Sequence, residues 1–69
     1  MKIKVYLEEK DKEEFVELEE NSKVRDVLDN LNIDSGIVII ANKHNEVVTV
    51  DYVLKDNEEI KIIPVISGG

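Results

Sequence analysis

Hydrophobic and polar residues alternate at the start of the chain, and this pattern predicts a half-buried strand over residues 2–8. A charged turn over residues 9–13 follows, and alternation then resumes over residues 15–19 with Val16 and Leu18 as the inward pair. Two alternating runs separated by a short polar turn are typical of a β-hairpin. The N-terminal part of the chain is therefore expected to form one.

A single apolar stripe at helical spacing comes next, and Ser22 is the expected N-cap of the helix that carries it. The stripe consists of Val24, Val27, Leu28 and Leu31. Residues 34–36 are expected to end this segment. So short a helix is marginal alone, and it must be held by packing its stripe against a sheet.

Three further strands are predicted in the second half of the chain, over residues 37–41, 47–50 and 59–65. The first is β-branched nearly throughout, which favours an interior strand covered on at least part of both faces. Asn57 can adopt a left-handed turn before the last strand, and Pro64 should weaken regular pairing near its end. This order predicts an α+β roll, one helix on a mixed sheet of about four to five strands, with the last strand central beside the first.

Length and composition exclude several classes of protein. Sixty-nine residues suffice for one domain, and the chain has no cysteine and one histidine, His44, so we expect no metal site. No serine lies at a telling distance from that histidine, which argues against an independent enzyme. A net charge of −7 disfavours direct binding of nucleic acid and favours a basic protein partner. No apolar segment of membrane-spanning length or signal-peptide type is present, so a cytoplasmic location is expected.

The last three residues, Ser67, Gly68 and Gly69, suit a slender tail better than a fold. We therefore expect a domain over residues 1–66 and a flexible diglycine tail over residues 67–69. Four apolar residues on the expected solvent face of the sheet are candidates for docking a partner. They are Tyr6, Phe15, Ile63 and Val65.

The element order and residues 54–69 together resemble the ThiS/MoaD family of ubiquitin-like sulfur carriers, of the small archaeal or bacterial type. Members of that family show a "leu-x-asp-gly-asp-x-ile" turn, an apolar strand, a proline and a terminal Gly-Gly. Here Asn57 stands in place of the turn glycine, and Pro64 precedes the diglycine. The resemblance implies a ubiquitin-like β-grasp fold. It leaves the thiamine, molybdopterin and tRNA branches open.

The resemblance also implies a function that lies at Gly69. An E1-like enzyme would use ATP and Mg to adenylate the Gly69 carboxylate, and sulfur would replace AMP to give a thiocarboxylate. Gly68 and Ser67 would thread into that enzyme, and the chain itself would bind no cofactor. The sulfur would pass to a thiazole synthase, to the large subunit of molybdopterin synthase or to a thiolase-type tRNA enzyme. Two alternatives remain, a protein modifier joined to lysines through Gly69 and a non-covalent ubiquitin-fold binding module.

Overall fold

The fold is seen in a computed structural model that describes residues 1–65, so that residues 66–69 lie outside the described part of the chain. In chain order the elements are β1 (Lys2–Leu7), a 3-10 helix (Glu8–Lys10), β2 (Lys12–Glu17), α1 (Val24–Asn30), a second 3-10 helix (Ser35–Ile37), β3 (Val38–Asn42), β4 (Val47–Val48) and β5 (Glu59–Pro64). The strands and α1 follow one another in the predicted order, and the two 3-10 helices were not predicted. The second strand begins earlier than expected because the turn before it is shorter.

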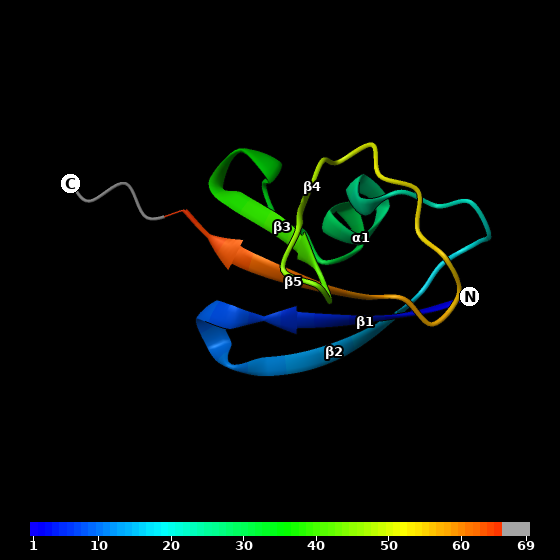
Figure 1. Ribbon diagram of the computed structural model, residues 1–69, viewed down its shortest axis with the longest axis horizontal. Helices are drawn as coiled ribbons and strands as arrows, with labels where there is room; N and C mark the ends of the chain where they lie inside the picture. Colours follow the sequence, from blue (N-terminus) through cyan, green and yellow to red (C-terminus); the bar gives the residue numbers. More distant parts are fainter. Residues whose placement is uncertain (66–69) are drawn as a thin grey trace.

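The five strands form one mixed sheet in the order β2-β1-β5-β3-β4 (Figure 1). β1 and β2 are antiparallel, β1 and β5 are parallel, and β3 is antiparallel to both β5 and β4. The last strand therefore lies at the centre of the sheet beside the first. The predicted α+β roll with a β-grasp arrangement is confirmed.

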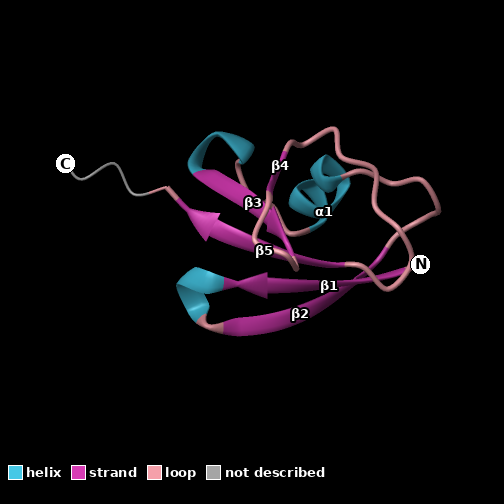
Figure 2. Ribbon diagram, viewed as in Figure 1, coloured by secondary structure: helices cyan, strands magenta, loops and turns pink. Residues whose placement is uncertain are grey.

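α1 packs across one face of the sheet, and within residues 1–65 the opposite face carries no helix (Figure 2). Alternation in the strands and the helical stripe supply the side chains of a single core. Its fully buried members are Ile3, Val5, Val16, Val24, Val27, Leu28, Ile40, Leu54, Ile60 and Ile62. No buried side-chain nitrogen or oxygen within residues 1–65 lacks a hydrogen-bond partner. The core is therefore apolar on the helix side, and polar chemistry is confined to the surface.

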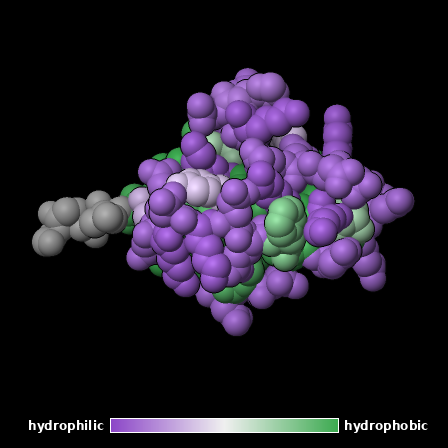
Figure 3. All heavy atoms as spheres, turned by 90° about the horizontal axis from the view of Figure 1, so that it is seen from below, coloured by the Kyte–Doolittle hydropathy of each residue, from purple (hydrophilic) through white to green (hydrophobic). Residues whose placement is uncertain are grey.

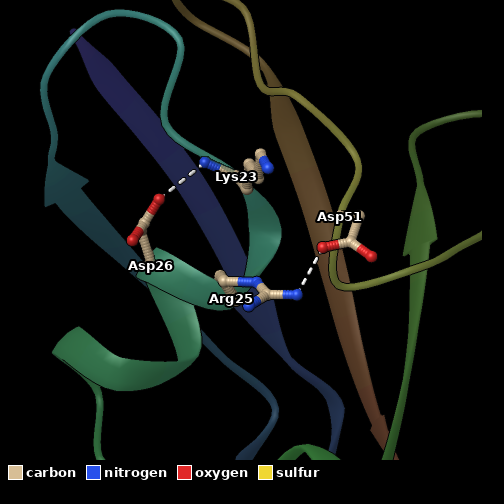
Figure 4. A network of polar contacts seen from close by, with 4 residues as sticks. All are labelled: Lys23, Arg25, Asp26 and Asp51. Carbon is tan, nitrogen blue, oxygen red and sulfur yellow. Dashed lines mark hydrogen bonds and ion pairs between the residues drawn. The ribbon is translucent and has the colours of Figure 1, made fainter.

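The prediction that Ser22 caps α1 is wrong, because the N-cap is Lys23. The Ser22 hydroxyl instead donates to the Glu19 carbonyl at 2.6 Å. In place of a cap by Ser22, the Lys23 backbone N–H donates to the Asp26 carboxylate at 2.8 Å (Figure 4). The first N–H groups of the helix donate to carbonyls of a distant loop, Val24 to Tyr52 and Arg25 to Val50. Since this loop satisfies groups that a side chain usually satisfies, a serine cap is not needed.

α1 ends at Asn30, before the predicted stop at residues 34–36. Asn32 follows with a φ of 57°, and the Ile33 N–H donates back to the Leu28 carbonyl at 2.8 Å. A left-handed residue, followed by an N–H that donates to a carbonyl in the last turn, is a common way to end a helix. In this chain the left-handed position is taken by asparagine in place of glycine. The same holds at Asn57, whose predicted left-handed turn is confirmed by a φ of 64°.

Candidate functional site

β5 is paired on both sides as far as Ile62, and beyond that its C-terminal end is paired on the β3 side. β5 lies between β1 and β3, Pro64 is the Cα partner of Val38, and the Val65 N–H donates to the Ile37 carbonyl at 2.8 Å. Ser67, Gly68 and Gly69, the predicted threading and activation residues, lie outside the described residues. The structure thus fixes the chain as far as Val65 (Figure 1).

The four predicted docking residues all belong to the open face of the sheet. Phe15 on β2 lies opposite Lys4 on β1, and Tyr6 is two residues further along β1. Tyr6 in turn lies beside Lys61 on β5, and Ile63 is two residues further along β5. Val65 continues the same face and is 49% exposed, while Phe15 is 61% exposed. These residues form a diagonal line across neighbouring strands, which we call the diagonal stripe. Its continuity is what a docking surface for a protein partner requires.

Ile39 adds a fifth residue to the diagonal stripe that the sequence did not indicate. It is the direct Cα partner of Ile63 and is 41% exposed. The β-branched run over β3 predicts cover on at least part of both faces. Within the described residues α1 lies over one face only; on the open face Ala41 is still 3% exposed, whereas Ile39 is not covered. One feature of the sequence bears on the exposure of Ile39. Neighbouring residues of a strand point to opposite faces, so Ile39 lies on the face opposite to buried Ile40.

Charged residues border the diagonal stripe and leave it narrow. Lys4 forms ion pairs with Glu13 at 2.7 Å and with Glu59 at 3.5 Å, and all three lie on the open face. The Tyr6 hydroxyl donates to the Asp11 carboxylate, and this bond raises the pKa of Tyr6. The Tyr6 ring is thereby held in place between charged neighbours. A partner would meet an apolar diagonal with a polar rim, the usual anatomy of a protein interface.

A separate hollow of about 520 Å³ lies beside the end of β5, between the sheet and the C-terminal end of α1. Its walls are mainly apolar and include Leu7, Leu31, Ile33, Ile37, Val38, Ile62 and Pro64. It was not predicted, because its walls come from five separate segments. It holds no pair of side chains in nucleophile–base contact.

The described residues offer no metal centre of their own. Within residues 1–65 no group of three or more histidine, cysteine, aspartate or glutamate side chains is placed to hold an ion. His44 lies exposed in the turn between β3 and β4, and its backbone N–H donates to the Asn42 side-chain oxygen. No helix in this part of the chain is long and apolar enough to cross a membrane.

The sheet order, with its last strand at the centre and one helix on one face, places the chain among the small ubiquitin-type β-grasp domains. The ThiS family model matches residues 3–69, nearly the whole sequence. The chain belongs to the ThiS family, and members of that family are sulfur carriers without enzymatic activity. The predicted family and the predicted lack of an activity of its own are both confirmed.

One solved structure supports this placement. It is a Pyrococcus furiosus protein assigned provisionally as molybdopterin converting factor, subunit 1, with a TM-score of 0.74 and 25% sequence identity. The match covers 94% of this chain and 98% of that one. No curated protein matches the chain. The fold of the whole domain is thus shared with a protein of the MoaD type.

Proposed function

We propose that this chain carries sulfur as a thiocarboxylate on Gly69 after adenylation by an E1-like enzyme. The observation that supports it most is the ThiS family match, which extends through residue 69. The tail would then follow directly from the central strand. The domain would span residues 1–66, and residues 67–69 would enter the partner's active site.

The proposed chemistry proceeds in balanced steps on the Gly69 carboxyl group. A carboxylate oxygen attacks the α-phosphorus of ATP and releases pyrophosphate, giving an acyl-adenylate. A persulfide on the donor attacks the acyl carbon and expels AMP, giving an acyl disulfide. A second thiol then cleaves the sulfur–sulfur bond, is itself oxidised to a disulfide, and leaves the thiocarboxylate. The reacting thiols would come from partners, because this chain has no cysteine. ATP and Mg would be bound by the activating enzyme.

The diagonal stripe is the surface that we propose the activating enzyme binds. Phe15, Tyr6, Ile63, Ile39 and Val65 present apolar side chains on the open face. Its end at Val65 lies at the origin of the tail, so docking on the stripe would direct Gly69 toward the enzyme. The proposal leaves the sulfur acceptor open among a thiazole synthase, a molybdopterin synthase large subunit and a thiolase-type tRNA enzyme, and it concerns the activation that all three require.

The test combines the chain with the E1-like enzyme from its own cell, ATP, Mg and a persulfide donor. Intact-mass analysis should show the oxygen-for-sulfur increment at the C-terminus. Deleting Gly68 and Gly69 should abolish both the increment and ATP–pyrophosphate exchange. If the full chain never gains the increment but glycyl-glycine remnants appear on lysines of other proteins, the modifier function replaces this proposal. Full function without the two glycines would leave only a non-covalent module.

Docking is tested separately through Ile63→Asp. This variant should raise the KM for the carrier in pyrophosphate exchange and leave the tail chemistry possible at high concentration. Val53→Asp is a matched control, because Val53 is 47% exposed and pairs with Lys23 at the start of α1, away from the open face. Equal effects of the two substitutions would remove the diagonal stripe from the proposal without affecting the role of Gly69.

A further inference from the structure

The outer edge of β2 has free backbone groups. β2 is the first strand in the sheet order, so β1 is its one neighbour among the described strands. Met1 and Leu18 exchange two backbone hydrogen bonds, at 2.6 and 2.8 Å, and therefore form a hydrogen-bonded pair. Because such pairs alternate along an antiparallel ladder, the N–H and C=O groups of Glu13, Phe15 and Glu17 point away from β1. They can pair with one more strand.

The side chains on this edge oppose pairing with a second copy of the same strand. Glu13, Phe15 and Glu17 share the open face of the sheet. If two copies of β2 paired antiparallel about Phe15, each Glu13 would lie opposite a Glu17 of the other copy. Like charges directly opposite each other destabilise a strand pair. The same acids would favour a strand with a basic residue opposite a glutamate and an apolar residue opposite Phe15.

The negative charge is strongest toward Glu17. Glu13 is already paired with Lys4 at 2.7 Å, whereas no ion pair of Glu17 is found in the described part of the chain. A surface hollow of about 690 Å³ adjoins that end of β2, and Figure 3, which views the molecule from the β2 side, shows a predominantly hydrophilic surface. Carboxylates in its wall come from Glu17, Glu19, Glu20, Asp26 and Asp29. Lys2 on β1 lies opposite Glu17, but its ammonium group sits over the Phe15 ring, 4.8 Å from the centroid, and forms no ion pair with Glu17. A basic side chain at this end would therefore meet a carboxylate that no ion pair among the described residues neutralises.

We propose that β2 binds an extended, basic segment of another protein by strand addition. The added strand runs antiparallel to β2, with an apolar residue opposite Phe15 and a lysine or arginine opposite Glu17. Backbone hydrogen bonds hold the segment, and the alternate side chains select it. This site does not depend on the proposed sulfur chemistry. It lies at the sheet edge, so a protein bound there would leave the C-terminal end of β5 accessible.

A synthetic peptide, acetyl-TKTVTKT-amide, is the probe. Binding to the full chain should shift the amide resonances of β2 in NMR spectra and slow hydrogen exchange at Glu13, Phe15 and Glu17. Two N-methylated peptides separate strand addition from charge attraction. Methylation of alternate amides on the side that faces β2 should abolish binding, and methylation on the outward side should leave it nearly unchanged. Equal effects of the two would overturn the proposal, as would binding that survives when both lysines are replaced by glutamate.

Variants of the chain supply a second test. Phe15→Pro removes the outward N–H, and Phe15→Ala removes the same ring but keeps that N–H, so the proline variant should bind the peptide about tenfold more weakly than the alanine variant. Glu17→Gln should weaken binding more than Glu13→Gln, because Lys4 already neutralises Glu13. Equal losses from the two glutamine variants would contradict the charge argument. Dimers formed through β2 in sedimentation would also overturn the proposal.

Discussion

Replacing Asn57 tests whether the turn before β5 depends on a left-handed backbone. Asn57 has a φ of 64°, and its N–H donates to the Lys2 carbonyl at 3.0 Å. The neighbouring Asp56 carboxylate accepts from the Lys2 N–H at 3.2 Å, and the Lys4 N–H donates to the Glu58 carbonyl at 3.0 Å. The turn therefore attaches the start of β5 to β1. It sets the register of the strand that leads toward the C-terminus.

The magnitude follows from the backbone, since no hydrogen bond of the Asn57 side chain is found within residues 1–65. A left-handed conformation costs roughly 1–2 kcal/mol for a residue with a Cβ, and asparagine tolerates it better than alanine. We expect Asn57→Ala to lower the free energy of unfolding by about 1 kcal/mol, which lowers Tm by about 4–8 °C in a domain of this size. Asn57→Gly should stay within about 0.5 kcal/mol of the parent, because the relief of strain is offset by greater freedom of the unfolded chain.

Urea denaturation followed by circular dichroism measures these differences. Asn30→Ala is the matched control, because Asn30 is the last residue of α1 and is not among the left-handed residues. It should not destabilise the fold, since alanine has a higher helix propensity than asparagine. If alanine costs as much at position 30 as at position 57, or glycine costs as much as alanine at position 57, the argument from backbone conformation is refuted.

Three further predictions concern the core, the tyrosines and a surface ion pair. Leu28→Ala should cost about 2–5 kcal/mol in urea melts, because Leu28 is 2% exposed in a core too small to collapse around the gap. Hydrogen bonds to Asp11 and Glu58 raise the pKa values of Tyr6 and Tyr52, so ultraviolet titration should show both phenols ionising above pH 10 in the folded protein and lower in urea. Asp51→Ala should cost less than about 0.5 kcal/mol, because its ion pair with Arg25 is exposed (Figure 4).

Each phenol has a higher pKa folded than unfolded, so its contribution to stability is complete below pH 10 and is lost as pH rises through the folded pKa. Equal titration curves in water and urea would contradict this. A Leu28→Ala cost below that of Leu31→Ala, at a half-buried position, would show that the core lies elsewhere. A large effect of Asp51→Ala would mean that the ion pair, and not the backbone bonds of Val24 and Arg25, joins the loop to α1.

Local patterns predicted the elements of this fold because each depends on neighbours close in sequence. The alternation in β1 and the stripe in α1 both report one buried face, and both were correct. The start of α1 was not predicted correctly, because Tyr52 and Val50 satisfy its first N–H groups from more than twenty residues away. A side-chain cap can be read from a sequence, but a carbonyl supplied by a distant loop cannot.

The candidate surface was predictable in part for the same reason. Tyr6, Phe15 and Ile63 can be recognised in the sequence as apolar residues at strand positions that alternate with the buried ones. Their diagonal arrangement could not be predicted until the register of the strands was known. Ile39 was missed because a β-branched run looks the same whether one or both faces are covered. Which of these holds depends on whether a second layer lies over the sheet. None does among the described residues, and that is a property of the whole fold.

The central position of β5 has a consequence for the point where the described chain stops. Within residues 1–65, the Val65 N–H donates to the Ile37 carbonyl on the β3 side of the sheet. Because successive N–H groups of a strand point to opposite sides, the Pro64 nitrogen faces the β1 side, where pairing ends at Ile62, and its missing N–H costs no bond to β3. Ile37 belongs to a short 3-10 helix that is held by the Asp34 carboxylate, which accepts from the Gly36 N–H at 2.9 Å. The strand before Pro64 has two neighbours, whereas Val65 depends on this one turn. The position of the backbone at Val65 therefore depends on Asp34 and residues 35–37 as well as on the core.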